Sequence, residues 1–290
     1  MKSNSSKIKV VITGASGFIG NNIVSLLKKD ENFIIYPVTR KKIKNFYEVS
    51  NYSDSPKGDV LIHLAEESEL KNVERMDSNY ENEKKSSLEY LIEKNFKVIV
   101  YTSSSILYGD QSPYPHLTTD KLYLLNRYSR LKKMSEELVL NSGGGLIARL
   151  GNVYGPGMSH KNVVSKIVNQ IPVESELLVF NKDPIRDFIW VKDVAECLAS
   201  LMKYGLESNR DSKIFNVGSG TGTSIEALAK LTLTLAGQPN MPIKSQNFDL
   251  PNSSIILDHT STIKVTGWEP RTTLTQGITH LLHLDRKITV

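Results

Sequence analysis

A tyrosine and a lysine stand four residues apart in the segment NRYSRLKKMSEE, residues 126–137. If this segment is helical, four residues make about one turn, so Tyr128 and Lys132 share a face. A phenol has a pKa of about 10 in water, too high for a base near neutral pH, but a neighbouring ammonium lowers it. The pair is therefore a candidate acid–base catalyst for an alcohol or a ketone. A solvated helix face could also carry this spacing by chance, so other parts of the chain must support it.

Three glycines follow the first apolar run of the chain in VVITGASGFIGNN, residues 10–22. Gly14, Gly17 and Gly20 lie between a predicted strand and a predicted helix, where a tight turn and a close backbone approach need glycine. The amino end of a helix binds phosphate through its unpaired N–H groups. The pattern therefore predicts a dinucleotide site. Its expected contacts are Gly14, Ser16, Gly17, Phe18, Ile19 and Gly20.

The end of the second predicted strand helps to choose the dinucleotide. An acid at this place binds the ribose hydroxyls of NAD, whereas an arginine accommodates the 2′-phosphate of NADP. The chain has Thr39 and Arg40 and no acid there. The cofactor is thus NAD or NADP, with NADP slightly favoured, unless Arg40 only covers the adenine or faces solvent.

The elements that must position these residues alternate between strand and helix. Apolar runs predict strands at residues 9–13, 33–38, 59–65, 97–103 and 146–150, with helices between them. This alternation predicts an α/β fold, a Rossmann-type doubly wound parallel sheet. After residue 157 the rhythm breaks, and residues 239–254, rich in Pro, Asn and Ser, read as a loop. We expect a smaller C-terminal α/β lobe there.

The composition excludes several classes of protein. The 290 residues carry a net charge of +5 without a basic stripe interleaved with aromatics, so nucleic acid is not expected as a partner. The one cysteine, Cys197, allows no internal disulfide and lies in an apolar helical pattern, so we expect it to be buried. No metal site is expected. No signal peptide or membrane span is predicted, and we expect a cytoplasmic protein.

The segment SSSILYG, residues 103–109, completes a resemblance to a known family. With the glycine turn and Tyr-x-x-x-Lys, it resembles the extended short-chain dehydrogenases and reductases, the NAD-dependent epimerase/dehydratase family. The resemblance makes Ser104, Tyr128 and Lys132 the catalytic triad. Ser105 would contact the substrate beside Ser104. Tyr128 and Lys132 would also bind the cofactor.

Further segments of the chain resemble elements of this family. VLIHLA, residues 60–65, would place Leu64 and Ala65 beside the cofactor, and Asn79 would follow on the next helix. RLGNVYGPG would bring Asn152 toward the substrate phosphates, and RDFIWVKDVAECL would bring Arg186 to the diphosphate. By the same resemblance, residues 1–152 and about 187–219 form the NAD(P)-binding domain. Residues from about 153 to 186 and from 220 to 290 form the substrate lobe.

The resemblance implies hydride transfer at C4 of a nucleoside-diphosphate hexose, in surface polysaccharide synthesis. Two reactions stay open, a 4-epimerase that retains NAD and a reductase of a 4-keto-6-deoxy sugar that consumes NADPH. The family's dehydratases place Asp and Glu after the triad hydroxyl, but Ser105 and Ile106 stand here, which argues against 4,6-dehydration. A second diphosphate arginine, expected near residues 246–249, is missing from the sequence.

Two other readings compete with this one. The chain could be a non-catalytic NAD(P)-binding regulator or scaffold, although such a protein has no need of a tuned phenol. It could instead reduce a non-sugar carbonyl, which would not require Asn152 and Arg186. Related enzymes form homodimers through helices corresponding to residues 79–94 and 128–141, and a homodimer is a possible assembly here.

Overall fold

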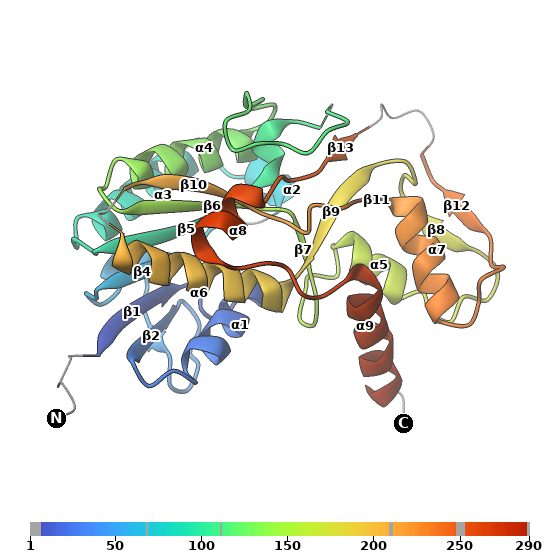
Figure 1. Cartoon of the computed structure of the whole chain (residues 1–290), viewed down its shortest axis with the longest axis horizontal. Coiled ribbons are helices and arrows are strands. Elements are labelled where there is room, and N and C mark those ends of the chain that lie inside the picture. Colours follow the sequence, from blue (N-terminus) through green and yellow to red (C-terminus); the bar gives the residue numbers. More distant parts are fainter. Residues whose placement is uncertain (1–6, 68, 111, 209–210, 248–252, 289–290) are drawn as a thin grey trace.

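A parallel seven-stranded sheet forms the centre of the protein (Figure 1). The structure, a computed structural model, describes residues 7–67, 69–110, 112–208, 211–247 and 253–288. The strand order is β10-β6-β5-β4-β1-β2-β3. The strands are β1 (Ile8–Thr13), β2 (Phe33–Thr39), β3 (Tyr47–Glu48), β4 (Val60–His63), β5 (Val98–Ser104), β6 (Gly145–Leu150) and β10 (Lys213–Val217). The predicted doubly wound α/β fold is confirmed.

Helices cover both faces of this sheet, which is why its strands read as continuous apolar runs. Alternate strand residues face opposite cores, as Val10 and Val11 of β1 do. One core is closed by α1 (Phe18–Leu27) and α6 (Val191–Glu207), which carries the buried Cys197. The other is closed by α3 (Tyr80–Ile92) and α4 (Arg127–Leu140), with α2 (Leu70–Glu74) against α4 (Figure 1).

A second group of elements forms the lobe at the right of Figure 1. Its four-stranded sheet consists of β7 (Asn152–Tyr154), β9 (Ile185–Trp190), β11 (Gly222–Ser224) and β13 (Ser254–Ile255). A second sheet pairs β8 (Leu177–Val179) with β12 (Ile243–Ser245), and the helices are α5 (Val163–Val168), α7 (Ile225–Leu235) and α9 (Leu274–Ile288). A separate apolar core joins them. The strands β12 and β13 lie within or at the edge of the segment that we expected to be a loop.

The boundary between the two parts differs from the sequence expectation in two places. Strand β9 pairs within the lobe's sheet as far as Trp190, although we expected residues from about 187 in the first domain. Helix α8 (Thr260–Thr266) packs against β10 and α6, and Trp268 belongs to the core of the large sheet. Residues 260–268 therefore return to the first domain, although we assigned residues 220–290 to the lobe. No helix in the described ranges has the length and apolar character needed to cross a bilayer.

The position of the site follows from the point at which the order of the strands in the sheet reverses, beside β1. From β1 the chain runs to β2 on one side, and it later returns to β4 on the other side. The loops after β1 and β4 therefore diverge and leave a crevice at the carboxyl ends of the strands. Gly14 has a φ of +69°, and a Cβ on it would lie 2.8 Å from the carbonyl carbon of Leu64. Only glycine allows the two loops to approach this closely.

A buried ion pair fixes α4 to the sheet. The Nε and Nη2 atoms of Arg149, on β6, donate to the two carboxylate oxygens of Glu136 at 2.9 and 2.8 Å. Arg149 also donates to the hydroxyl of Tyr108, which lies in the short helix η2 (Ser105–Tyr108). The exposed fractions of the Arg149 and Glu136 side chains are 2% and 0%. The charges are therefore compensated by each other and not by water.

We expect Arg149→Met to lower the free energy of unfolding by about 3 to 5 kcal/mol, because Glu136 is left charged and buried without a partner. Urea unfolding measures the change. Lys133→Met is the control, because it breaks the exposed pair of Lys133 with Glu137 and should cost less than about 1 kcal/mol. Equal losses in the two variants would contradict this role of the buried pair.

Candidate functional site

The turn between β1 and α1 has the geometry of an anion-binding site. Gly17 is the N-cap of α1 and provides no side-chain cap, and the first turn of the helix holds no acidic residue. A Cβ on Gly20 would lie 2.2 Å from the carbonyl oxygen of Gly14, so the helix packs directly on the turn. Because the first N–H groups of a helix lack partners within it, this turn could hold the diphosphate of a dinucleotide.

A cavity of about 500 Å³ opens above this turn, and we call it the glycine pocket. It brings together most of the predicted cofactor residues from β1, α1, β4, β5 and α4. The predicted residues that line it are Gly14, Gly17, Phe18, Ile19, Gly20, Leu64, Ser104, Tyr128 and Lys132. At its other wall, the carboxylate of Glu69 bonds to the ammonium of Lys161 and to the hydroxyl of Ser159.

Four predicted cofactor residues do not line the glycine pocket. The hydroxyl of Ser16 shares a 2.8 Å hydrogen bond with that of Thr39, and Ala65 is half-buried next to Leu64. Arg40 is exposed, with its guanidinium 5.4 Å from the ring centre of Tyr52 in the short helix η1 (Tyr52–Asp54). Asn79 is also exposed, and its amide donates to Glu83 at 3.1 Å. The structure therefore does not bring Asn79 to the cleft.

The first turn of α4 is held in place by its cap and by an arginine. The side chain of Asn126 accepts from the Ser129 N–H at 2.8 Å, and the Ser129 hydroxyl completes a capping box. Arg127 donates to the carboxylate of Glu81 at 2.8 Å and to the carbonyl oxygen of Met76 at 2.6 Å. These contacts tie the start of α4 to α3 and to the segment that follows α2, so Tyr128 has a fixed position.

Tyr128 and Lys132 lie on the same face of α4, as their spacing predicts. The Lys132 Nζ lies 5.9 Å from the centre of the Tyr128 ring and donates to the carbonyl oxygen of Thr102 at 2.9 Å. The exposed fractions of Tyr128 and Lys132 are 9% and 7%. The ammonium is therefore held beside the phenol in a largely dry environment, where a charge acts more strongly than in water.

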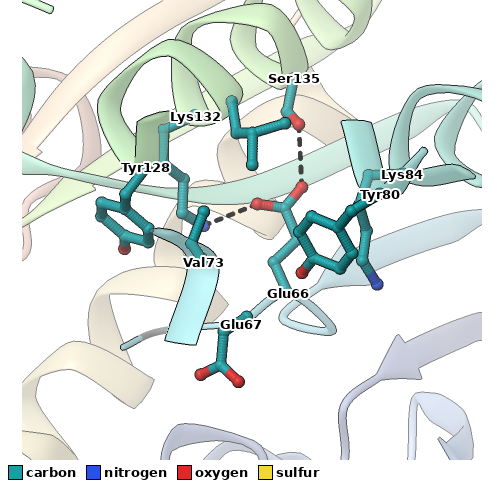
Figure 2. A pocket seen from close by; sticks show the side chains of 9 residues that line it. Glu66, Glu67, Val73, Tyr80, Lys84, Tyr128, Lys132 and Ser135 are labelled. Atoms are coloured by element: carbon teal, nitrogen blue, oxygen red, sulfur yellow. Dashed lines mark hydrogen bonds and ion pairs between the residues drawn. The ribbon is translucent and has the colours of Figure 1, made fainter. Parts of the chain in front are cut away.

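Sequence reasoning missed an acid beside this lysine. The Nζ of Lys132 lies 2.9 Å from Oε2 of Glu66, which follows β4 by three residues (Figure 2). Tyr101 donates to the same carboxylate at 2.6 Å, and Ser135 donates at 2.9 Å. Two signals were available in the sequence. Ser135 is three residues after Lys132 on the same helix, and Glu66 is only three residues beyond the end of β4.

A second cavity, of about 350 Å³, is also lined by Tyr128, and we call it the arginine pocket. The four predicted substrate residues Ser104, Ser105, Asn152 and Arg186 all line it. The hydroxyl of Ser104 accepts from the Ile106 N–H at 3.3 Å, so its own hydrogen remains available to a ligand oxygen. The structure therefore gathers the predicted substrate residues in one place.

Arg186 is fixed at the wall of the arginine pocket by Ser253, the residue that precedes β13. Its guanidinium donates to the hydroxyl of Ser253 at 2.6 Å and to the Ser253 carbonyl oxygen at 3.1 Å. Burial lowers the pKa of Arg186, and the nearby charge of Asp110 opposes this shift. Asp110 is the only acid among the described residues that line the pocket. Residues 248 and 249, within the expected place of a second arginine, lie outside the described residues.

The two pockets meet at the phenol. Ser104, Tyr128 and Gly151 line both of them, so a group in one pocket could reach a group in the other past the Tyr128 side chain. Within the ranges that the structure describes, no three His, Cys, Asp or Glu side chains gather as metal ligands would. The arrangement places a phenol, a group that can donate or accept a proton, at the junction of two ligand-sized cavities.

Solved structures with the same fold support this description. A UDP-glucose 4-epimerase from Thermotoga maritima with UDP-glucose is 23% identical, with a TM-score of 0.82 over 98% of this chain and 100% of that chain. RMD from Pseudomonas aeruginosa complexed with NADPH is 24% identical, with a TM-score of 0.83 over the same shares. A dTDP-glucose 4,6-dehydratase from Bacillus anthracis in complex with NAD is 17% identical, with a TM-score of 0.80 over 97% of each chain.

The sequence itself identifies the family. The model of the NAD dependent epimerase/dehydratase family matches residues 10–218, which run from β1 through the glycine turn to the end of β10. They include all residues that line the glycine pocket and all but one of those that line the arginine pocket. The match covers well over half of the chain, and the elements within it include both the Tyr128–Lys132 pair and Arg186. The chain belongs to the NAD dependent epimerase/dehydratase family.

Proposed function

We propose that this protein transfers hydride at C4 of a nucleoside-diphosphate hexose, either as a 4-epimerase or as a reductase of a 4-keto-6-deoxy sugar. The observation that carries the proposal is the position of Tyr128 at the junction of the glycine and arginine pockets. The dinucleotide would occupy the glycine pocket and the sugar nucleotide the arginine pocket. The phenol would then lie where the nicotinamide and the sugar meet.

The residues at the junction have distinct tasks in this proposal. When it is bound, the nicotinamide supplies or accepts the hydride. Tyr128 gives a proton to the sugar oxygen during reduction and takes it during oxidation. Lys132 stabilises the phenolate by its charge, and Ser104 donates a hydrogen bond to the same sugar oxygen. Ser105 and Asn152 contact the sugar nucleotide, and Arg186 binds its diphosphate.

The end of β2 supports NADP over NAD in this proposal. The position where an acid would bind two ribose hydroxyls holds the buried Thr39, whose hydroxyl is already bonded to Ser16. The next residue is the exposed Arg40, whose guanidinium stacks on Tyr52 and could meet a 2′-phosphate. This favours the reductase, which exchanges NADPH with solution. The frequency of epimerases in the family favours the epimerase instead, so both reactions stay in the proposal.

The positions directly after Ser104, where the family's dehydratases carry Asp and Glu, hold no acid in this chain. The two residues after Ser104 are Ser105 and Ile106, and neither can exchange a proton with a sugar carbon. Asp110 lies near Arg186 and so at the diphosphate end of the arginine pocket. We therefore do not include 4,6-dehydration in the proposal. The cytoplasmic location and a homodimer through α3 and α4 remain sequence-based proposals.

Replacing the phenol tests the proposal directly. We expect Tyr128→Phe to lower kcat by about 100-fold or more, because the proton donor is lost. The loss of one hydroxyl contact should raise the dissociation constant of the dinucleotide, measured by fluorescence titration, by less than about tenfold. Tyr90→Phe, at a tyrosine exposed on α3, is the control and should retain full activity. A Tyr128→Phe enzyme with wild-type kcat would refute the proposal and favour the non-catalytic reading.

The diphosphate contact is tested by binding. We expect Arg186→Gln to weaken binding of the preferred sugar nucleotide by about 10- to 100-fold, the usual loss for a charge-assisted hydrogen bond. Calorimetry with UDP-, GDP-, CDP- and dTDP-linked sugars first identifies that ligand and then measures the variant. Arg130→Gln, at an exposed position of α4, should bind as the wild type does. Binding that is unchanged in Arg186→Gln would favour a non-sugar carbonyl as substrate.

The cofactor preference separates the two reactions. We expect Arg40→Ser to raise the dissociation constant of NADPH by about tenfold and to leave that of NADH unchanged, because only NADPH carries the 2′-phosphate. The nucleotide content of the purified wild-type protein is measured alongside. Tightly retained NAD together with no consumption of NADPH would exclude the reductase and leave the epimerase.

A further inference from the structure

The carboxylate of Glu66 accepts contacts from three side chains near Tyr128, those of Lys132, Tyr101 and Ser135. Figure 2 shows it between Lys132 and Ser135, with Tyr128 on the far side of the lysine. Tyr101, on β5, donates to Oε2 at 2.6 Å, and Ser135 donates to Oε1 at 2.9 Å. The Glu66 side chain is 14% exposed and the Lys132 side chain 8%. The charges of Glu66 and Lys132 therefore face each other largely out of water.

Both members of this pair are ionised at neutral pH. Burial raises the pKa of Glu66, but the charge of Lys132 outweighs this effect, with help from the hydrogen bond of Tyr101, so the pKa is lowered. Burial lowers the pKa of Lys132, but the charge of Glu66 outweighs it, and the pKa is raised. Each group thus keeps the other charged. The pair is a permanent dipole whose positive end lies beside Tyr128.

The geometry of Lys132 leaves it one further contact. An ammonium has three donors. Within the described part of the chain, Lys132 uses one on the carbonyl oxygen of Thr102 and one on Glu66. The third can meet a hydroxyl group in the glycine pocket, which Lys132 lines. Glu66 therefore helps to determine where that third donor points.

Several other charged or titratable groups surround the phenol. His63 on β4 is neutral near pH 7, because burial lowers its pKa to about 4. Glu136 is already compensated by Arg149. The remaining groups that line a pocket with Tyr128, or lie within reach of its charge, are Glu66, Glu67, Glu69, Tyr80, Lys84, Tyr101, Asp110, Lys132, Lys161 and Arg186. Among them, Glu66 alone is hydrogen-bonded to Lys132 within the described residues.

We propose that Glu66 is a positioning residue that fixes the ammonium of Lys132 and offsets part of its charge at Tyr128. The proposal rests on the acid–base role of Tyr128 proposed above. A lone lysine at this distance would hold the phenol strongly toward its ionised form. The neighbouring carboxylate weakens this effect, so the phenol can still donate a proton in the reducing direction near neutral pH. Glu66 would thereby set the pH range in which the enzyme works.

The decisive variant is Glu66→Gln, which removes the charge and retains the size of the side chain. We expect the midpoint of the pH–kcat profile to move to lower pH by about one unit, because the charge of Lys132 beside the phenol is then no longer offset by a carboxylate. The sign is the same for both directions of the reaction, because both midpoints follow the loss of the phenol proton. Glu137→Gln removes an equal charge from the exposed face of α4, and it should leave the midpoint unchanged.

Two milder variants test the same idea with the opposite sign. Tyr101→Phe and Ser135→Ala each remove one donor to the carboxylate and leave its charge in place. The uncompensated negative charge near the phenol then grows, so the midpoint should move to higher pH by a few tenths of a unit. These variants keep the proposal testable if Glu66→Gln does not fold. If a folded Glu66→Gln keeps the wild-type midpoint, or if neither mild variant shifts it, the proposal is overturned.

A second readout separates this proposal from the proposed function. The ultraviolet absorbance of phenolate, titrated in each protein and in its Tyr128→Phe counterpart, gives by difference the ionisation of residue 128 without any substrate. The midpoint of this titration should also fall by about one pH unit in Glu66→Gln. An acid shift in a protein that has no activity on any sugar nucleotide would refute the proposed function and retain the role of Glu66. Activity without a shift would refute only that role.

Discussion

The contact between Lys132 and the carbonyl oxygen of Thr102 joins the two elements on which the site depends. It ties the second turn of α4 to the end of β5, and β5 continues directly into Ser104 and η2. Because Tyr128 lies one turn before Lys132, the same contact sets the distance between the phenol and the Ser104 hydroxyl. The buried pair of Arg149 and Glu136 holds the next turn of α4 to β6. Two polar contacts one turn apart thus prevent α4 from sliding or rotating over the sheet.

The strands and helices of the first domain could be predicted from the sequence because each has one simple pattern. The apolar run of β5 is buried on both faces from Val98 to Ser103. The glycines after β1 are required by a close approach that any larger side chain would prevent. The Tyr128–Lys132 spacing was sufficient to predict a shared face. Ser104, Asn152 and Arg186 could be placed only by resemblance, since nothing in their own spacing brings them to one pocket.

Other features could not be predicted, because they depend on contacts between distant segments. The return of residues 260–268 to the first domain depends on Trp268, whose indole donates to a backbone oxygen of α6. No periodicity in the sequence reveals such a partner. Glu66 follows a recognisable strand, but its side chain is bonded to residues 35 to 69 positions away. Asn79 is the reverse case. Its position in the sequence matches the family's asparagine, but its side chain bonds to Glu83, four residues away on α3, and does not reach the cleft.

The alternation of side chains along β9 has a further consequence. Asp187 points inward and accepts from the backbone N–H groups of Ser219, Gly220 and Leu257, which fixes the crossing of three chain segments. The side chain of its neighbour Arg186 then points to the opposite face of the strand, and its hydrogen bond to Ser253 keeps the guanidinium in one position. If a ligand is anchored there by its phosphates, the fixed distance from Arg186 to Tyr128 selects ligands by the distance between their anion and their reactive carbon. A molecule whose reactive carbon lies too near to its anion, or too far from it, would be bound and yet never presented to the phenol.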